Sequence, residues 1–520
     1  MFIKPQRLLG EGLLFSEMRY STKPAIIYKE NKFSYSQVYN TALNLACWLV
    51  KSGIKKGDRV AIYMNNSWQC AVSIYGVSLA GGVFLVINPQ TKANKLAYII
   101  NDSGAKVLIA ESNCLTEVRK SIGEINTLPT FIISEEVPTD FEIQNYLVFS
   151  ELIKPLAENI TLPVIIPNDL AALIYTSGST GFPKGVMMTH QSMVFTTWSL
   201  LEYLRMNEDE KIMLVLPLAF DYGLYQLLMA ITIGGTLIIE HSFNFPPTIF
   251  RQIEKQQPTV FPGVPSIFAI MIATHKKTGL KFESVTKITN TAAALPEEFT
   301  TDLRSIFPNA LIYKMYGLTE CKRVCYLEPE LAEIKINSVG KAIPGTEVFL
   351  LTEDGLPVKP GEQGILHVRG PHVMAGYWNN QELTNKMLKP GIIPGEKVLC
   401  AHDLFKMDDE GFLYFLGRND DIIKTRGEKV SPIEVENAIY KHKLIKEAAV
   451  IGIPDIILGE AIIAYITTYN NNPVEEKEIQ KHCNTLLESF MVPKRIIYLN
   501  EMPKSSNGKI NKLELKKMSL

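Results

Sequence analysis

The sequence lacks the features that mark secreted, membrane-spanning and nucleic-acid-binding proteins. Its 53 Lys and Arg residues nearly balance 54 Asp and Glu residues, and a net charge of −1 creates no field that would gather nucleic acid. The N-terminal Met-Phe-Ile-Lys-Pro-Gln-Arg is not followed by the apolar core and cleavage site of a secretory signal. The longest apolar stretch, near Leu227–Ile239, is interrupted by glycine and is too short to span a bilayer. We therefore expect a soluble, cytoplasmic protein with no integral membrane segment and no nucleic acid partner.

Cysteine is also scarce. The chain has seven cysteines, an odd number whose spacing matches neither a disulfide framework nor a zinc site. Cys321 and Cys325 would share a face if their segment were helical, but two cysteines without a nearby histidine make a poor metal site. We expect reduced thiols that act as small apolar or polar side chains. The seven are Cys47, Cys70, Cys114, Cys321, Cys325, Cys400 and Cys483.

The length of 520 residues is too great for one hydrophobic core, although 46% apolar and 21% charged residues are ordinary for globular proteins. From about residue 34 to 239, helix-period stretches alternate with short apolar runs, which predicts an α/β fold with two parallel-type subdomains. Between about 337 and 418, glycine and proline are dense and the apolar runs are short, which predicts a β-rich subdomain. The predicted domains are a large N-terminal one, residues 1–418, and a small α+β C-terminal one, residues 419–520.

Several secondary-structure elements can be placed by residue. Ser34 and Gln37 fit a capping box that opens a helix running to Lys51. Further helices are expected over Trp68–Ala80 and Pro432–Lys443. Strands are expected at Arg59–Met64, Val83–Val86, Val107–Ala110, Leu170–Ile174, Ile212–Leu216, Thr236–Ile239, Thr259–Phe261, Leu311–Met315, Glu347–Leu351, Ile365–Arg369, Ala448–Gly452 and Ala461–Tyr469.

The most informative segment is the loop Tyr175-Thr-Ser-Gly-Ser-Thr-Gly-Phe-Pro-Lys-Gly185. Its glycines let the backbone approach a ligand closely and turn N–H groups inward, while its hydroxyl groups add donors. Such a loop suits phosphate oxygens, and Lys184 adds a mobile positive charge. It is not a P-loop, because the Gly-Lys-Ser/Thr ending is absent. The ordered Pro-Lys-Gly ending favours a phosphate site over the alternative, a flexible surface loop.

This loop resembles the phosphate loop of the adenylate-forming superfamily, which includes acyl-CoA synthetases, amino-acid adenylation domains and firefly luciferase. The resemblance covers residues 171–509, and six blocks carry it in the family's order. They are the phosphate loop, Tyr316-Gly-Leu-Thr-Glu320, Gly364–Gly370 with Gly376-Tyr377-Trp378, Asp403, Gly417–Lys424 and Pro503–Lys509.

The resemblance implies an ATP-dependent, AMP-forming ligase that makes an acyl-adenylate and pyrophosphate and then transfers the acyl group to a thiol. Since a carboxylate must approach an anionic phosphate, catalysis rests on positioning and charge neutralisation. By the family's pattern, Glu320 helps to hold Mg²⁺, which prefers oxygen ligands, and Thr319 contacts the α-phosphate. Lys184 and the loop would cradle the β- and γ-phosphates. The loop residues concerned are Thr176, Ser177, Gly178, Ser179, Thr180 and Gly181.

The nucleoside has its own predicted residues. The resemblance implies that Tyr316 stacks on adenine, that Asp403 accepts hydrogen bonds from both ribose hydroxyls, and that Arg418 also reaches the ribose. Taken singly, each has a plain structural alternative, such as a core tyrosine or a solvated carboxylate. Their ordered combination favours the nucleotide site.

Two half-reactions would share this site. Lys509 would bridge the substrate carboxylate and the α-phosphate, and would leave before a thiol approaches. The resemblance implies that the C-terminal domain is mobile and rotates about Asp420, and that Gly427 then faces the pantetheine channel. The alternatives are a surface lysine at 509 and an ordinary polar linker at Asn419–Asp421.

The acyl end departs from the pattern of many acyl-CoA synthetases. Phe220 stands where many of them carry histidine, and Asp221 resembles the aspartate that pairs with the substrate's ammonium in the amino-acid-activating branch. This favours a polar or amino acid substrate, but Asp221 as a cap of the following helix is an equal alternative. The predicted pocket residues are Phe220, Asp221, Asn290, Thr291 and Ala292.

The acceptor also stays open at this point. The favoured reaction uses ATP, Mg²⁺ and CoA, and the alternative acceptor is the phosphopantetheine arm of a carrier protein. A third interpretation is a catalytically silent nucleotide-binding protein, which the presence of Lys509, Glu320 and Asp403 argues against. Nothing in the sequence requires a luciferase-like oxygenase.

Overall fold

The structure is a computed structural model of the whole chain. It describes residues 5–134, 146–156, 158–176, 182–291, 295, 297–335, 338–418, 423–430, 432–468, 474–503, 510 and 512–519. None of the helices in these ranges combines the length and the hydrophobicity that a membrane span requires.

The first sheet has eight strands in the order β19-β9-β8-β4-β3-β5-β6-β7. The run from β8 to β7 is parallel, and β9 and β19 extend it antiparallel at one edge. The strands are β3 (Arg59–Tyr63), β4 (Val83–Ile87), β5 (Val107–Ala110), β6 (Thr130–Ile133), β7 (Tyr146–Val148), β8 (Leu170–Thr176), β9 (Lys184–Thr189) and β19 (Gly376–Tyr377). Its helices are α2 (Tyr35–Lys51), α3 (Trp68–Leu79), α4 (Ala93–Ser103), α5 (Leu115–Ser121), α6 (Phe149–Leu152) and α7 (His190–Tyr203).

The second sheet has fourteen strands and changes character along its length. Its first half is parallel apart from the edge strand β2, and it comprises β1 (Pro24–Tyr28), β2 (Asn31–Ser34), β10 (Lys211–Leu214), β11 (Thr236–Ile239), β12 (Val260–Gly263), β13 (Lys287–Asn290) and β14 (Leu311–Tyr316). The helices of this half are α1 (Leu9–Tyr20), α8 (Asp221–Ile233), α9 (Pro246–Gln256), α10 (Pro265–Thr278) and α11 (Glu297–Ile306).

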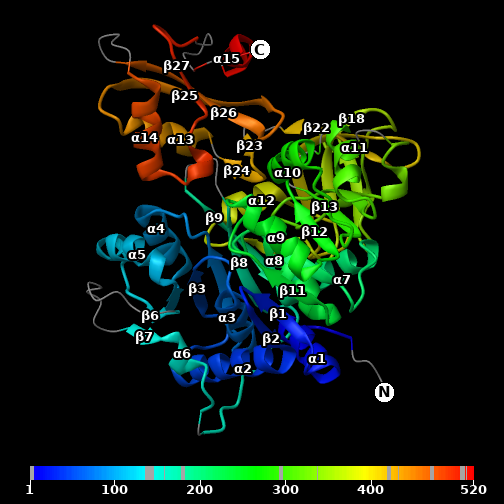
Figure 1. Ribbon diagram of the computed structural model, residues 1–520. Helices are drawn as coiled ribbons and strands as arrows, with labels where there is room; N and C mark the ends of the chain where they lie inside the picture. Colours follow the sequence, from blue (N-terminus) through cyan, green and yellow to red (C-terminus); the bar gives the residue numbers. More distant parts are fainter. Residues whose placement is uncertain are drawn as a thin grey trace.

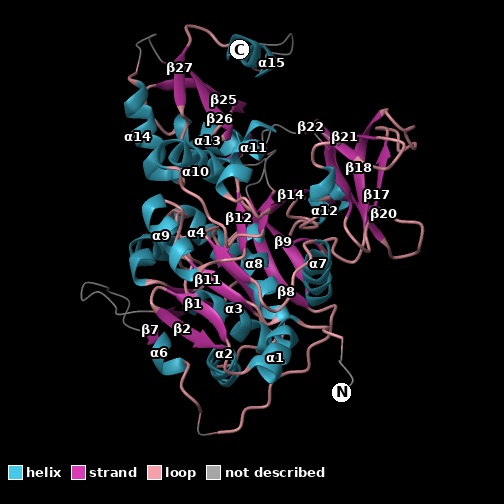
Figure 2. Ribbon diagram, turned by 45° about the vertical axis from the view of Figure 1, so that its right-hand side comes forward, coloured by secondary structure: helices cyan, strands magenta, loops and turns pink. Residues whose placement is uncertain are grey.

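The other half of this sheet is antiparallel and forms the β-rich subdomain, seen on the right in Figure 2. Apart from the eleven-residue β21, its strands have seven residues or fewer, and most of the dense glycine and proline lies in the turns between them. They are β15 (Cys325–Leu327), β16 (Ser338–Ala342), β17 (Glu347–Leu351), β18 (Gln363–Arg369), β20 (Leu388–Pro390), β21 (Lys397–Met407) and β22 (Leu413–Arg418), with the helix α12 (Gln381–Met387) beside them.

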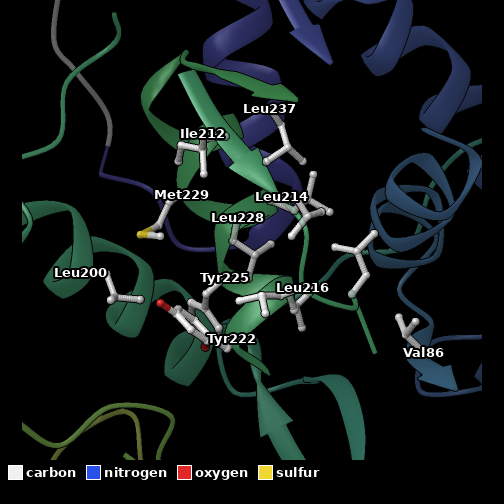
Figure 3. Close-up of a cluster of buried hydrophobic side chains, with 14 of the residues drawn as sticks. Val86, Leu200, Ile212, Leu214, Leu216, Tyr222, Tyr225, Leu228, Met229 and Leu237 are labelled. Carbon is white, nitrogen blue, oxygen red and sulfur yellow. The ribbon is translucent and has the colours of Figure 1, made fainter. Parts of the chain in front are cut away.

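One hydrophobic core joins the two sheets. Helices α3 and α8 are buried around nearly their whole circumference, as expected of apolar helices without a polar face. Figure 3 shows Tyr222, Leu228 and Met229 of α8 packed beside the strand residues Leu214 and Leu237. This packing fixes the start of α8, which becomes one wall of the pocket described below.

The C-terminal part is a separate five-stranded sheet, drawn at the top of Figure 1. Its strands are β23 (Ile423–Thr425), β24 (Glu428–Val430), β25 (Ile445–Asp455), β26 (Gly459–Thr468) and β27 (Arg495–Tyr498). Alternate residues of β25 and β26 face opposite sides. One side packs on α13 (Pro432–Tyr440), α14 (Glu476–Leu486) and the short helix η5 (Ser489–Met491), and the other packs on α15 (Lys512–Ser519).

The predicted fold class is therefore confirmed, because two α/β sheets, a β-rich subdomain and a small α+β unit are all present. The capping box at Ser34 is present, and α2 ends at Lys51 as predicted. The predicted strands match observed ones to within a few residues at each end. The Cys321–Cys325 segment is not helical, since Cys325 begins β15. All seven cysteines are free thiols.

Candidate active site

A pocket lies where the carboxyl ends of both parallel sheets meet the C-terminal unit. Asn88 follows β4, Thr291 follows β13 and Gly317 follows β14, so each of these pocket residues sits just beyond a strand. In open α/β sheets, ligands generally bind in the crevice outside the carboxyl ends of the strands. From the C-terminal unit, the hairpin β23–β24 and η5 complete the lining.

The predicted phosphate side of the site is built around Glu320, which directly follows the pocket residue Thr319. Its carboxylate is buried, and the Tyr377 hydroxyl donates a hydrogen bond of 2.6 Å to its Oε1 atom. Lys184 Nζ lies 3.4 Å from the same oxygen and donates to the Tyr377 hydroxyl at 3.0 Å. β9 and β19 are paired neighbours, so the first sheet holds both Lys184 and Tyr377, while Glu320 comes from the second. The site therefore joins the two sheets.

Thr176 and Thr319 both line the pocket. Thr176 Oγ1 is buried and has no hydrogen-bond partner among the described residues. Lys322 Nζ donates to the Thr319 carbonyl at 2.9 Å, and burial lowers the Lys322 pKa to about 8. The predicted loop residues Ser177, Gly178, Ser179, Thr180 and Gly181 lie outside the described residues.

Tyr316 and Asp403 form the predicted nucleoside side. Both are buried, and the Tyr316 hydroxyl donates a hydrogen bond to Asp403 Oδ2. Lys424 Nζ of β23 lies 5.8 Å from the centre of the Tyr316 ring, which brings the C-terminal unit over the same site. Arg418 pairs with Asp403 across β21 and β22, and its side chain is not described.

At the predicted acyl end, Asp221 is the first residue of α8. The N-cap position is occupied by Phe220, which makes no side-chain capping bond. Because Asp221 lies one residue inside the helix, the alternative that it is the N-cap is wrong. Instead, Asp221 Oδ2 lies 3.3 Å from Nη1 of Arg323, a guanidinium that is only 2% exposed. Arg323 also lies 5.1 Å from the Tyr222 ring centre. The pocket wall thus contains an ion pair.

The remaining predicted residues are placed as follows. Thr291 lines the pocket and Asn290 is buried at the end of β13, while Ala292 lies outside the described residues. Gly427 lines the pocket with a φ of +80°, and a Cβ there would approach Val264 Cγ1 to 2.7 Å, so the close approach of the hairpin to the N-terminal part requires glycine. Asp420 and Lys509 lie outside the described residues.

Comparison with known proteins identifies the family. The model of the AMP-binding enzyme family matches residues 16–378, and that of the AMP-binding enzyme C-terminal domain matches residues 434–509. A long-chain-fatty-acid–CoA ligase of Bacillus subtilis is 31% identical, over 97% of this chain and 93% of that protein. The chain belongs to the AMP-binding enzyme family.

This AMP-binding enzyme also resembles a CoA synthetase and a gramicidin synthase. A solved structure of a double mutant of o-succinylbenzoate CoA synthetase from Bacillus subtilis is 25% identical, with a TM-score of 0.83 over 97% of this chain and 98% of that one. A linear gramicidin synthase of Brevibacillus parabrevis is 27% identical over 94% of this chain, which is 6% of that protein. The AMP-binding enzyme is accordingly an AMP-forming acid–thiol ligase. Its use of ATP and Mg²⁺ is consistent with a structure of the o-succinylbenzoate enzyme that contains both.

The structure adds side chains that the sequence prediction did not include. Tyr377 belongs to one of the matching blocks, but nothing in its neighbouring residues indicated contact with Glu320. Arg323 follows Glu320 by three positions, yet nothing in the sequence pairs it with Asp221. Lys424 lies in the predicted hinge block, and only the folding of the hairpin brings it to Tyr316.

Proposed function

We propose that this AMP-binding enzyme forms the CoA thioester of a small acid that carries a polar or charged group, such as an amino acid. The Asp221–Arg323 ion pair in the pocket wall carries the proposal. A long alkyl chain packed against this ion pair would desolvate both charges and offer them no polar partner beyond each other, which is costly. Arg323 Nε and Nη2 have no hydrogen-bond partner among the described residues, so an acceptor group on the acid would also lower the cost of burying them.

In the first half-reaction, an oxygen of the substrate carboxylate attacks the α-phosphorus of ATP. A new P–O bond forms, the bond to the β-phosphate's bridging oxygen breaks, and pyrophosphate leaves. Lys184 and the loop of residues 176–181 would hold the leaving phosphates, Thr319 the α-phosphate, and Asp403 with Arg418 the ribose beside Tyr316. A cation about 4 Å from developing charge is worth roughly 4 kcal/mol at intermediate dielectric.

Glu320 fits the expected role at Mg²⁺. It offers one buried carboxylate, and the described residues contain no group of three or more His, Cys, Asp or Glu side chains that could hold a metal. Mg²⁺ commonly binds through one or two carboxylates together with substrate phosphates. Bound there, the ion would neutralise charge on the phosphates.

The second half-reaction would use the C-terminal domain, which we propose begins at residue 419 and turns about Asp420. The thiol sulfur attacks the acyl carbonyl, the bond to the phosphate oxygen breaks, and AMP leaves. The hairpin of β23–β24, with Gly427, lines the pocket. Ile510, the residue after Lys509, packs on the α15 side of the sheet, whereas η5, which lines the pocket, packs on the opposite side together with α13. An approach of Lys509 would therefore require the domain to turn.

The acceptor has two candidates. CoA is supported by relatives named as CoA ligases, and a carrier protein's phosphopantetheine arm is supported by the likeness to a gramicidin synthase. The chemistry at the thiol is the same for both. We therefore propose CoA as the acceptor and keep the carrier protein as the second candidate.

Pyrophosphate exchange tests this function. The purified enzyme is given ATP, Mg²⁺ and a panel of long-chain fatty, aromatic, hydroxy and amino acids. We expect kcat/KM for a polar or amino acid to exceed that for a long-chain fatty acid by at least about tenfold, a difference of about 1.4 kcal/mol. A preference for the fatty acid would overturn the polar-substrate proposal. Addition of CoA, or of a carrier protein whose phosphopantetheine thiol is free, then identifies the acceptor by thioester formation.

A further inference from the structure

An ionic contact joins the two parts of the molecule at the pocket, whose lining includes Lys95 and Glu488. Lys95 Nζ of α4 lies 2.8 Å from Glu434 Oε1 of α13 and 3.1 Å from Glu488 Oε1, just before η5. The lysine side chain is 17% exposed, and the two glutamates are 10% and 5% exposed. Because the group is nearly buried, salt screens it much less than a surface ion pair.

The position of Lys95 is unfavourable within its own helix. It is the third residue of α4, where the helix dipole disfavours positive charge. Burial also lowers its pKa, but the charges of Glu488 and Glu434 outweigh burial and raise the pKa overall. The lysine thus depends on the two carboxylates of the C-terminal part for its stability as a cation.

The lysine is in turn a favourable partner for the two carboxylates. Burial raises the pKa of Glu434, and Lys95 partly offsets this while Glu488 adds to it. Without the lysine, two buried carboxylates would face each other and repel. Two further contacts lie nearby, since Ser489 Oγ donates to Gln90 Oε1 at 3.1 Å and Gly427 packs on Val264. All of these contacts cross from the N-terminal part to the C-terminal part.

In this structure the contact is made while the β23–β24 hairpin lines the pocket. If the C-terminal domain turns to present Lys509, α13 and η5 move with it, and both glutamates leave Lys95. An interaction made in one of two orientations shifts the population toward that orientation. We infer that Lys95, with Glu434 and Glu488, is a positioning group that stabilises the thiol-accepting orientation over the adenylating one. This inference rests on the proposed function.

Half-reaction kinetics of Lys95→Met test the inference. Transfer of the acyl group from supplied acyl-adenylate to CoA should slow about tenfold relative to pyrophosphate exchange, because the thiol-accepting orientation is less populated. Lys287→Met is the matched control, since Lys287 forms a similarly buried ion pair inside the N-terminal part. Its Nζ lies 2.5 Å from Glu210 Oε1. This control variant should lower Tm and keep the ratio of the two rates. The double variant Lys95→Glu with Glu434→Lys should recover part of the transfer rate that Lys95→Glu loses. Equal slowing of both half-reactions in Lys95→Met would overturn the inference.

A second measurement needs no turnover and so separates this inference from the proposed function. Gln90→Cys and Ser489→Cys are introduced together, and their crosslinking by a short bismaleimide is followed with and without Lys95→Met. We expect the yield to fall several-fold when Lys95 is replaced. An unchanged crosslinking yield would reject the positioning role even if the enzyme's substrate is still unknown. Absence of pyrophosphate exchange with every acid in the wild-type protein would count against the proposed function alone.

Discussion

The Tyr377 hydroxyl donates a 2.6 Å hydrogen bond to Glu320 Oε1, and through this bond the edge strand of one sheet orients a carboxylate on a loop of the other. Both groups are buried. A hydrogen bond to a charged group contributes about 1.5–3 kcal/mol, more than a neutral one, so this bond has the strength to hold the Glu320 carboxylate in one position.

Removal of that hydroxyl should impair adenylation. We expect Tyr377→Phe to lower kcat/KM for MgATP in pyrophosphate exchange by about tenfold or more, because Glu320 loses its orienting donor. Tyr326→Phe is the control, since Tyr326 donates a bond of the same 2.6 Å length to Glu328 outside the pocket. Similar losses in both variants would mean that Tyr377 acts only on stability.

The nucleoside assignment predicts a selective loss of ATP affinity. Asp403→Ala should raise KM for ATP by about tenfold to a hundredfold, because two ribose hydroxyls would lose a charged acceptor. KM for the acid should change little. Asp408→Ala removes a carboxylate from a turn outside the pocket and should leave KM for ATP unaltered. A rise in KM for the acid alone would place Asp403 elsewhere in the reaction.

The ion pair in the pocket wall predicts a change of substrate preference. In Asp221→Asn, kcat/KM for an acid with an ammonium group should fall by about two orders of magnitude, since the pairing of the Asp221 carboxylate with that ammonium is lost. The same variant should keep most of its activity with an acid of equal size that lacks the ammonium. If both acids lose activity equally, Asp221 supports the fold of the wall and does not contact the substrate.

The assignment of Lys509 predicts a split between half-reactions. Lys509→Ala should abolish acyl-adenylate formation, yet largely spare thioester formation from supplied acyl-adenylate, because only the first step needs a cation between two anions. Lys517→Ala, on the exposed side of α15, serves as the control. The moving-lysine assignment fails if Lys509→Ala slows both steps to the same extent.

His190 predicts a dependence of stability on pH. It is buried at the start of α7, its Nδ1 accepts a hydrogen bond from the Leu9 N–H at 3.3 Å, and burial lowers its pKa to about 4, despite Asp169 and Glu11. The unfolded chain then binds a proton at higher pH than the folded one. Stability from this residue is present above about pH 6.5 and is lost as the pH falls toward 4.

Denaturation in urea at pH 7.5 and pH 5.0 measures this effect. The loss of unfolding free energy between the two should be smaller in His190→Asn than in the wild type, by at most about 2 kcal/mol. Asn keeps an acceptor for the Leu9 N–H and does not titrate. An identical pH dependence in the two proteins would show that His190 is not the group that titrates.

Local patterns were sufficient for much of this protein. A capping box at Ser34 places α2, and strand-length apolar runs place β5, β11 and β17, because these signals lie within a few neighbouring residues. The loop of residues 175–185 indicates a phosphate site for the same reason, while the reaction was implied by the resemblance of six ordered blocks to the adenylate-forming superfamily. Phosphate binding needs a particular order of small, polar and basic residues along the chain.

The partners of those residues became known only from the folded chain. Their separations along the chain are large: 57 positions for Glu320–Tyr377, 87 for Tyr316–Asp403, 102 for Asp221–Arg323 and 393 for Lys95–Glu488. Each pair depends on how segments far apart in the chain come together, within one sheet for Tyr316 and Asp403 and between sheets or domains for Glu320–Tyr377 and Lys95–Glu488, and no local periodicity encodes that packing. The sequence therefore indicated which chemistry is performed. The tertiary structure decided which charges meet in the pocket wall and across the domains, because long-range burial brings those charges together.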